Sequence, residues 1–490
     1  MALSIKYFMW RWQAHFRVVM EGIAKELFAK LDERLEPSVF LVGVLTDKRR
    51  TDRHFTCVEP EGDFWIHSDE FHGIAEDAEQ LVSEYRGAEH QEGHAVQVAI
   101  RDAIRMRIAT HPGIPEKRRV YVSIPSQVDD YLVCLVLMLR DDIASSYPEL
   151  RRSRVFLHPD RSFPVPISLV DAAAHKFVGH VEEELRKDDP SMPFGADTDG
   201  MLRAAGAELA RGMVWRMSDT SLVMGHGLFR DCSAISSMRY ERAEGRGRIL
   251  FAPEDHPQRS QDVKLREPVK LYEYRAARKL LQLAFDDISL MSQGSELTGL
   301  TDLALDSGGD ETVFEVRIVA HHRWELWSYD RHLMTVRYGL PSLPTAAFNE
   351  ARFRELIANK FPSTGTQEVD RLCKLVEQAS SEAHGTMLVI SADAKSEVER
   401  LSSQATAIEP RLLDDKLLNH LTPIDGAILI DSHGYCHAIG VILDGDATNR
   451  GDPARGARFN SAIRYVDSVK RKAPALAAVV SEDGGVDIVS

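Results

Sequence analysis

The sequence predicts an α/β protein, in which a large α+β N-terminal region precedes a C-terminal mixed-sheet domain with flanking helices. Three observations support this class. Helical and strand-like apolar patterns are mixed in the first third of the chain, and short apolar strands alternate with helices after residue 346. Between these regions, the segment Gly339–Pro344 carries two prolines, which interrupt regular structure. We therefore predict two domains, 1–345 and 346–490, with a further split near 150–200 as an open alternative.

Length, composition and charge indicate a globular protein of more than one domain that does not bind nucleic acid. The 490 residues exceed one average domain, and a hydrophobic fraction of 44% is typical of globular proteins. Asp and Glu number 75 against 60 Lys and Arg, which gives a formal net charge of −15. This acidic balance argues against nucleic acid as a partner, because such binding needs a basic face. It leaves room for a local basic pocket that holds a nucleotide.

The N-terminal region begins with a predicted helix over 14–35 and a strand over 39–45. Residues 119–126 alternate as a half-buried strand does, and the apolar run 131–139 predicts a strand buried on both faces. That run is too short to cross a bilayer as a helix, which takes about 20 residues. Charged residues also interrupt the apolar N-terminus, so no signal peptide is expected. We therefore expect no membrane association and a cytoplasmic protein.

The cysteine pattern agrees with that compartment. Five cysteines lie far apart and form no CxxC pair: Cys57, Cys134, Cys232, Cys373 and Cys436. Neither a disulfide framework nor a thiolate zinc site follows from this spacing. Reduced thiols are the expectation.

The middle of the chain is punctuated by polar segments. Residues 187–199 and 252–268 predict surface loops, and residues 312–338 predict two or three adjacent strands. The last domain then predicts helices over 367–383, about 411–420 and about 457–472, and strands over 386–390, 427–431, 435–443, 475–480 and 486–489. A turn over 432–434 joins two of these strands, and a second turn follows at 483–485.

Asp425 and Gly426 stand immediately before one of these strands. A carboxylate at a strand edge can meet a metal ion or a ligand hydroxyl, and a neighbouring glycine lets the ligand approach the backbone. The alternative is that Asp-Gly forms a simple turn.

A cluster of arginines surrounds a predicted helix start at Gly456. Exposed backbone N–H groups at a helix start attract anions, and arginine suits forked contacts with phosphate. The cluster comprises Arg450, Arg455, Arg458 and Arg464. The alternative is a solvated helix start with ion pairs to Asp452 and Asp467.

Together these segments resemble the diadenylate cyclase (DAC, or DisA_N) domain. The resemblance covers HGTMLVIS (384–391), IDGAILIDSHGYCHAIGVIL (424–443), RGARFNSAIRYV (455–466) and AAVVSEDGGVDIV (477–489). That family has an Asp-Gly-Ala motif, a Gly-Thr-Arg-His-Arg motif about thirty residues later and a late Ser-Glu. Order, spacing and flanking strands agree over about the last 125 residues.

The resemblance implies synthesis of cyclic di-AMP and pyrophosphate from two ATP molecules by a nucleotidyltransferase. Two domains would meet face to face, in a homodimer or a higher oligomer, with Mn²⁺ or Mg²⁺ as the cofactor. Asp425 would bind the metal and help deprotonate the 3′-hydroxyl, and Gly426 and Arg458 would complete the catalytic set. The implied ATP-binding residues are Gly385, Thr386, Ala427, Leu443, Gly456, Ala457, Phe459, Asn460, Ser461, Ser481 and Glu482.

The sequence departs from the family at the second motif. Ala457-Arg458-Phe459-Asn460 replaces Thr-Arg-His-Arg, so the phosphate site loses one positive charge and two hydrogen-bonding groups. Losing one preorganised stabiliser can cost about 10²–10³ in rate. The rival hypothesis is therefore a catalytically weakened module that binds ATP or a cyclic dinucleotide as a sensor. Spatial substitution by Arg455 or Arg464 is a third possibility.

The N-terminal region carries a second resemblance. Segments 37–45 and 322–344 resemble the probable sensor domains of the DACNV kind, which precede soluble DAC domains. This implies a small-molecule or protein ligand of unknown identity for the N-terminal region.

Overall fold

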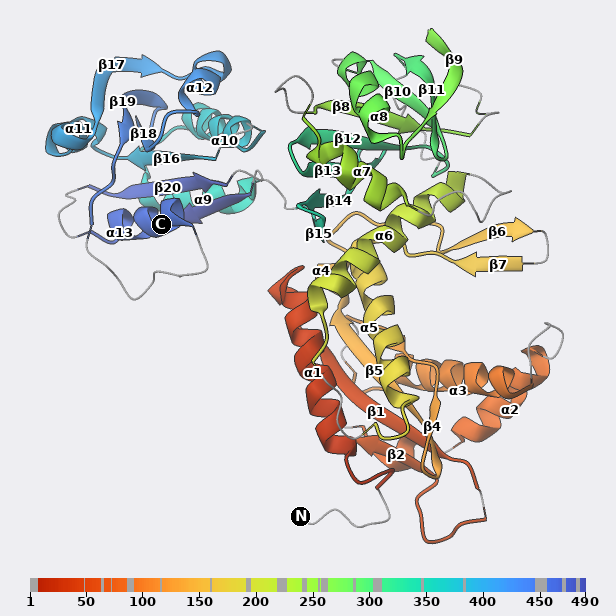
Figure 1. Ribbon diagram of the computed structural model, residues 1–490. Helices are drawn as coiled ribbons and strands as arrows, with labels where there is room; N and C mark the ends of the chain where they lie inside the picture. The colour runs from red at the N-terminus through yellow and green to blue at the C-terminus, as the bar shows by residue number, and fades with distance from the viewer. Residues whose placement is uncertain are drawn as a thin grey trace. The chain divides into compact units, whose positions relative to one another are not determined.

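The computed structural model places the chain in two compact units, 1–344 and 345–490, which are described separately (Figure 1). The first unit ends at Pro344, the second proline of the interrupting segment. The structure describes residues 8–47, 49–62, 66–71, 73–85, 92–114, 117–158, 161–190, 195–217, 227–239, 245–253, 256, 263–284, 288–302, 311–344, 348–381, 385–445, 456–468, 473–481 and 485–490.

An antiparallel sheet forms the first half of unit 1. Its strands run in the order β2-β1-β5-β3, and β4 also pairs with β5. The register sets Val42 opposite Cys134 and Tyr121 opposite Leu137. The strands are β1 (Ser38–Leu45), β2 (Thr56–Glu59), β3 (Arg118–Val122), β4 (Ser126–Val128) and β5 (Tyr131–Arg140).

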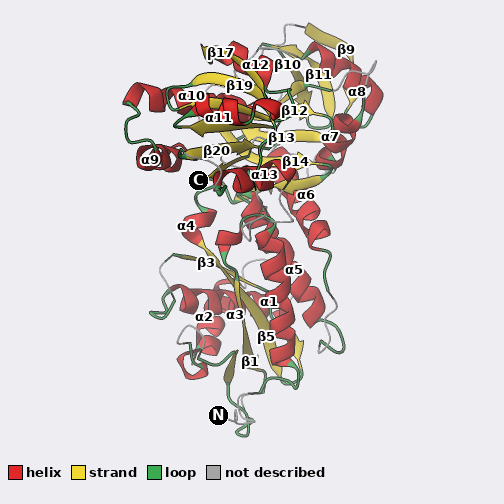
Figure 2. Ribbon diagram, turned by 90° about the vertical axis from the view of Figure 1, so that its left-hand side faces the viewer, coloured by secondary structure: helices red, strands yellow, loops and turns green. Residues whose placement is uncertain are grey.

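Helices cover both faces of this sheet (Figure 2). One face packs on α2 (Ile74–Tyr85) and α3 (Glu92–Ala109), and the other packs on α1 (Gln13–Ala29) and α5 (Leu169–Leu185). Residues Val133–Leu139 of β5 are all buried, which confirms the prediction of a strand buried on both faces.

A second sheet of eight strands occupies the rest of unit 1, in the order β15-β14-β13-β12-β8-β10-β11-β9. Its apolar face packs on α6 (Thr198–Met217) and α7 (Leu228–Ser237). The strands are β8 (Gly247–Phe251), β9 (Val263–Lys270), β10 (Ser289–Gln293), β11 (Glu296–Thr301), β12 (Phe314–Ala320), β13 (Arg323–Ser328), β14 (Arg331–Arg337) and β15 (Leu340–Ser342). Smaller elements complete the unit: α4 (Asp141–Ala144), α8 (Tyr274–Leu280) and the ribbon β6 (Arg154–His158) with β7 (Arg161–Pro164).

Several predicted boundaries in unit 1 are wrong. The loop prediction over 252–268 overlaps β9, whose exposed residues lack an apolar alternation. The interrupting segment contains β15, because Pro341 lies on an edge strand where one missing N–H is tolerated. The helix predicted over 14–35 ends at Ala29.

Unit 2 is built on a mixed six-stranded sheet in the order β17-β19-β18-β16-β20-β21. Strands β16 and β18 are parallel, and every other neighbouring pair is antiparallel. The strands are β16 (Thr386–Ser391), β17 (Thr406–Leu412), β18 (Ala427–Asp431), β19 (Tyr435–Val441), β20 (Ala475–Val480) and β21 (Val486–Val489). The predicted mixed-sheet α/β class is therefore confirmed.

Alternate residues of the central strands feed two separate apolar cores. In β16, Leu388 and Ile390 face α9 (Glu350–Lys360), α10 (Thr366–Ser381) and α12 (Asp415–Leu421). Met387 and Val389 face α11 (Ala394–Arg400) and α13 (Ala457–Val466) on the opposite side. The sheet is thus covered by helices on both faces.

The sequence located most of these elements but missed three. It missed α9, α11 and the edge strand β17, and the helix expected from about residue 411 begins at Asp415 because β17 runs to Leu412. The helix expected over 457–472 ends at Val466. The turn at 483–485 lies largely outside the described residues.

Candidate functional site

One end of the unit 2 sheet gathers several of the residues singled out from the sequence. The parallel strands β16 and β18 begin at this end, and the antiparallel strands β19 and β20 finish there. The register pairs Met387 with Ala427, Ala427 with Val441, and Thr386 with Val480. The sheet topology therefore brings these segments together: Gly385–Thr386, Asp425–Ala427, Leu443 and Ser481.

Asp425 is an exposed carboxylate at this sheet end. Its Oδ1 accepts the Gly426 N–H at 3.0 Å, and no ion pair engages it among the described residues. Gly426 has φ +105°, and a Cβ there would lie 2.7 Å from the carbonyl carbon of Gly440. The two strands can approach this closely only because residue 426 has no side chain. This conformation holds Asp425 at the edge with its carboxylate open to solvent.

Thr386 lies at the same end but on the other face of the sheet. Alternation along β16 sets it on the side of Leu388 and Ile390, away from α13. It is 1% exposed, and its hydroxyl has no hydrogen-bond partner within the described part of the chain. The sequence motif did not predict that Thr386 is separated from the α13 side, because the face on which a residue lies depends on its position in the alternation along the strand.

Helix α13 carries the second motif and packs on β20 and β21. Gly456 is its N-cap residue, and Ala457 is exposed at its first position. Arg458 is half-buried and makes no ion pair in the described ranges. Phe459 and Leu443 both pack at the edge of the apolar core on this face of the sheet. The structure therefore brings Leu443 and Phe459 to one cluster beside an unpaired arginine.

The polar residues of α13 turn back on their own helix. The side-chain amide of Asn460 donates to the Gly456 carbonyl at 3.4 Å. The Arg464 guanidinium donates to the Asn460 carbonyl at 3.2 Å and to the Ser461 hydroxyl at 3.4 Å. Arg464 also lies six residues from Arg458, about 9 Å along the axis. These contacts do not favour Arg464 as a replacement for the missing arginine.

The remaining predicted residues are only partly described. Ser481 is exposed, and its hydroxyl donates to the Gly485 carbonyl at 3.1 Å. Glu482, Arg450, Arg455 and Asp452 lie outside the described residues.

A partly buried ionic cluster, which the sequence did not reveal, fixes the chain just after β19. Arg400 of α11 forms paired contacts with Asp444 at 2.6 and 3.0 Å, and its Nη2 also donates to Glu397 at 2.8 Å. The Tyr465 hydroxyl of α13 donates to Glu397 at 2.9 Å. The two carboxylates raise the pKa of the Arg400 guanidinium. We call Glu397, Arg400, Asp444 and Tyr465 the clamp; it ties the segment holding Leu443 to both helices of this face.

The residues at the sheet end supply only part of the ligand set that a hard divalent cation such as Mg²⁺ needs. Among the described residues, no group of three or more His, Cys, Asp or Glu side chains could hold a metal ion. Asp425 offers one exposed carboxylate. Mg²⁺ sites of this kind often use one or two carboxylates and complete the shell with water and substrate phosphates. Asp425 is therefore compatible with a metal that arrives together with a nucleotide.

Two family models match the chain, both in unit 1. Residues 9–210 match the family described as "Probable sensor domain DACNG", and residues 226–330 match "Probable sensor domain DACNH". No curated protein matches the chain. The prediction of a probable sensor region is thus confirmed, although the matching kinds are DACNG and DACNH where the sequence suggested DACNV. The two matches adjoin between residues 210 and 226, downstream of the split considered near 150–200.

Proposed function

We propose that unit 2 is a diadenylate cyclase-type nucleotidyltransferase, which condenses two ATP molecules into cyclic di-AMP and two pyrophosphates under control of the N-terminal sensor region. The observation that carries this proposal is the sheet end. An exposed carboxylate, Asp425, lies there where Gly426 and Gly440 approach closely. The same unit presents Arg458 at a helix start, with no ion pair among the described residues. The matched sensor families are also associated with diadenylate cyclases.

The proposed reaction needs in-line positioning and neutralised charge. The 3′-oxygen of one ATP forms a bond to the α-phosphorus of the other, and the bond from that phosphorus to the bridging oxygen breaks. Pyrophosphate leaves, the 3′-hydroxyl proton is lost, and the same step in the opposite sense closes the ring. Asp425 would accept the proton or hold the metal, and Arg458 would contact the triphosphate. A bound Mg²⁺ or Mn²⁺ would supply charge neutralisation at the phosphates.

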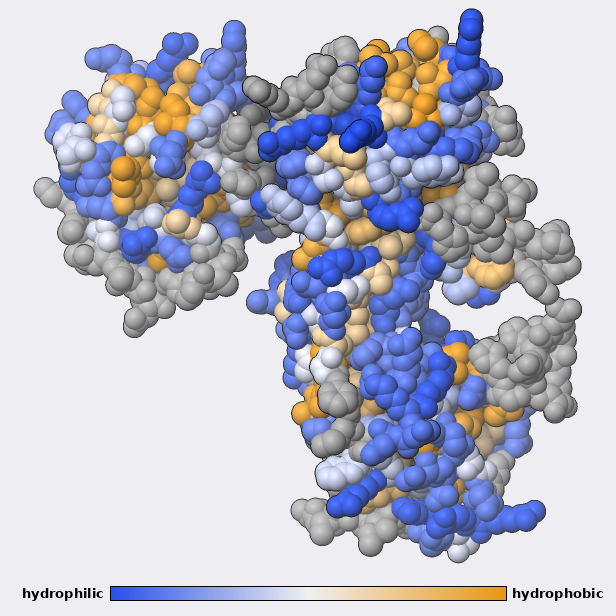
Figure 3. Space-filling model, viewed as in Figure 1, coloured by the Kyte–Doolittle hydropathy of each residue, from blue (hydrophilic) through white to orange (hydrophobic). Residues whose placement is uncertain are grey.

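Two copies must meet for this chemistry, since each supplies one ATP. Apolar side chains next to the proposed site are suited to such a meeting. Ile424 is 40% exposed beside Asp425, and Ile442 is 63% exposed beside Leu443. Figure 3 shows apolar surface on the visible face of unit 2. Because rotation of the two copies would separate the half-sites, a sensor region that changes their pairing would change the rate.

The test is direct. The purified full chain is incubated with ATP and Mg²⁺ or Mn²⁺, and cyclic di-AMP is sought by chromatography and mass. Asp425→Ala should abolish the product, whereas Glu409→Ala, which removes an exposed carboxylate on β17, should leave it unchanged. Product that persists in Asp425→Ala would refute the role given to Asp425.

The second candidate function is nucleotide sensing without turnover. Phe459 and Asn460 favour it, since the Asn460 amide bonds to its own helix and Phe459 packs on an apolar core. Tight ATP binding with no product in any metal would support this function over catalysis. The double variant Phe459→His with Asn460→Arg, which restores the family residues, should then gain measurable cyclase activity.

The pairing of two copies yields a further prediction. Ile442→Glu buries a charge in the proposed contact, so the rate should become low and strongly dependent on protein concentration. Leu412→Glu, which alters another exposed apolar side chain, on the edge strand β17, is the control. The measurement is the rate of cyclic di-AMP formation over a hundredfold range of protein concentration, for both variants. An unchanged rate in Ile442→Glu would contradict this contact.

A further inference from the structure

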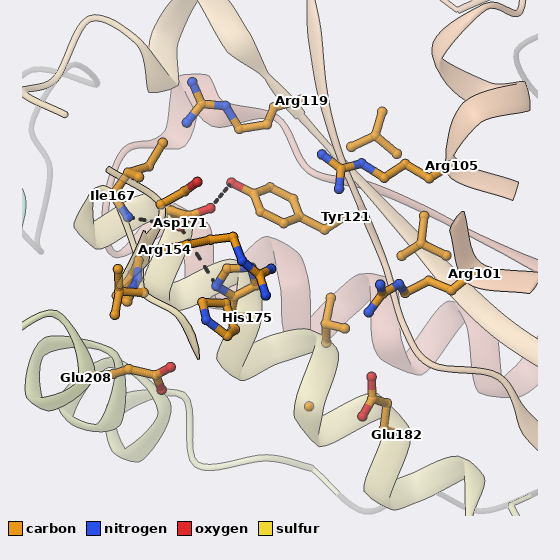
Figure 4. Close-up of a pocket in the computed structure, with 18 residues that line it drawn as sticks. Arg101, Arg105, Arg119, Tyr121, Arg154, Ile167, Asp171, His175, Glu182 and Glu208 are labelled. Atoms are coloured by element: carbon orange, nitrogen blue, oxygen red, sulfur yellow. Dashed lines mark hydrogen bonds and ion pairs between the residues drawn. The ribbon is translucent and has the colours of Figure 1, made fainter. Parts of the chain in front are cut away.

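A cavity of about 790 Å³ lies in unit 1, entirely within the range that matches the DACNG sensor family. Helix α3 forms one wall, β3 and α5 form the base, and the segments around β6 and β7 close the opposite side (Figure 4). Its volume is in the range of 300–1,000 Å³ that is usual for small-molecule sites. The proposed cyclase residues contribute nothing to it.

Arginines face this cavity from two sides. Figure 4 shows Arg101 and Arg105 of α3 pointing inward from one wall and Arg154 from the other. Arg105 makes no ion pair within the described ranges. Within the described residues, the Arg154 guanidinium donates to Ser162, at 2.9 Å to the hydroxyl and 3.3 Å to the carbonyl. Arg101 pairs with its neighbour Asp102 at 2.9 Å. Two guanidinium groups are therefore available to an anion.

The acidic groups of the cavity are already engaged by the protein. Asp171 accepts the Tyr121 hydroxyl and the Ile167 N–H, each at 3.1 Å. Burial raises the pKa of Tyr121 well above its usual value, so this phenol keeps its proton and remains a donor.

The other two carboxylates of the lining also have partners within the protein. Glu182 accepts the Ile124 N–H at 2.7 Å, and Glu208 pairs with Lys176 and Arg211. Arg119 is likewise held by Asp141 and Glu149. Of the arginines that line the cavity, Arg105 and Arg154 make no ion pair with a carboxylate within the described part of the chain.

The rest of the lining is largely apolar. Valine and proline side chains alternate with the polar groups: Val120, Val122, Pro164, Val165, Pro166 and Val178. This combination suits a ligand with a carbon skeleton, and forked guanidinium groups suit carboxylate or phosphate oxygens.

We propose that this cavity binds a small organic anion that carries two or more carboxylate or phosphate groups, with Arg105 and Arg154 holding groups at its two ends. This anion is the ligand of the sensor region. The binding stands independently of the proposed cyclase activity, so the two can fail separately.

Titration calorimetry on the full chain tests the proposal with citrate and inorganic pyrophosphate as probes and glycerol as the neutral control. Citrate binding alone assigns carboxylates, and pyrophosphate binding alone assigns phosphates. Arg105→Ala and Arg154→Ala should each weaken the bound probe about tenfold or more. Arg203→Ala, an exposed arginine of α6 outside the cavity, should have no effect. Arg458→Ala shows whether pyrophosphate binds in unit 2 instead.

A second variant tests the cavity by filling it. Gly179 of α5 lines the cavity, and a Cβ there would meet no atom within 4 Å. Gly179→Phe should therefore fold normally and still block binding of the probe. Failure of both probes to bind, or binding that persists unchanged in Arg105→Ala, Arg154→Ala and Gly179→Phe, would overturn the proposal.

Discussion

Gly426 occupies a backbone position that other residues cannot adopt without strain. Its φ of +105° is outside the range that L side chains prefer, and the Gly440 backbone leaves no space for a Cβ. The Asp-Gly pair lies in a bend just before β18, and this bend leaves Asp425 exposed. Conformation and the proposed chemistry require the same glycine.

Gly426→Ala should lower the free energy of unfolding of unit 2 by about 2–4 kcal/mol, because strain and a backbone clash add. Urea titration followed by circular dichroism measures the change. Gly22→Ala is the matched control, since Gly22 is exposed in α1 with no atom within 4 Å of an added Cβ. That variant should stabilise the protein by about 0.5–1 kcal/mol. Equal effects of the two variants on stability would show that residue 426 can carry a Cβ without strain or a clash.

The five cysteines are free thiols, as the sequence spacing indicated, and the structure shows that all five are buried. Burial raises the pKa of Cys57, Cys373 and Cys436 to about 11 and that of Cys134 to about 12. Since the thiolate is the reactive species, a disulfide reagent at pH 8 should label the folded chain very slowly. Denaturant should release five reactive thiols per chain. Rapid labelling of the folded protein would show that a thiol is more accessible than the structure indicates.

At the scale of elements, the sheet end of unit 2 depends on contacts between helices as well as on strand order. The clamp joins α11, α13 and the segment after β19 through Arg400 and Glu397. Glu397 and Tyr465 are buried members of this cluster, so removing the donor from Tyr465 leaves a buried carboxylate with one hydrogen bond fewer. The clamp should therefore hold Leu443 in position against α13.

Tyr465→Phe should destabilise unit 2 by about 1–2 kcal/mol, since it removes a buried donor to the Glu397 carboxylate. Tyr435→Phe is the matched control, because the Tyr435 side chain is 41% exposed on β19. That change should stay within about 0.5 kcal/mol. Thermal unfolding of both variants measures the difference. If Tyr465→Phe leaves the stability of unit 2 unchanged, the clamp does not stabilise this unit.

The whole molecule consists of two units whose apolar cores share no residue. Residues of unit 1 form three of the buried clusters, and residues of unit 2 form the other two. Among the described residues, every helix is too short or too polar to cross a bilayer. Separate cores allow each unit to unfold on its own and to respond to its own ligand.

Differential scanning calorimetry should therefore resolve two transitions. ATP with Mg²⁺ should raise only the transition that Tyr465→Phe lowers, and citrate should raise only the other. A ligand at a hundred times its Kd stabilises its unit by about 2.7 kcal/mol. One transition shifted by both ligands would indicate that the two units unfold together.

The sequence by itself determined the class of the fold, most strands of unit 2 and the positions of Asp425 and Gly456. Apolar periodicity encodes these features locally, and glycine reports backbone constraints. It could not reveal β17, because that edge strand is polar, exposed and interrupted by Pro410. Edge strands need neither an apolar face nor a complete set of N–H donors.

Only the tertiary structure decided which of the candidate residues meet. Strand order gathers Asp425, Leu443 and Ser481 at one sheet end, while strand parity turns Thr386 to the other face. The clamp and the arginine-lined cavity likewise join residues from separate elements, such as Arg400 with Tyr465 and Arg105 with Arg154. Contacts of this kind are set by packing and by charge pairing in three dimensions, and neither leaves a fixed spacing along the chain.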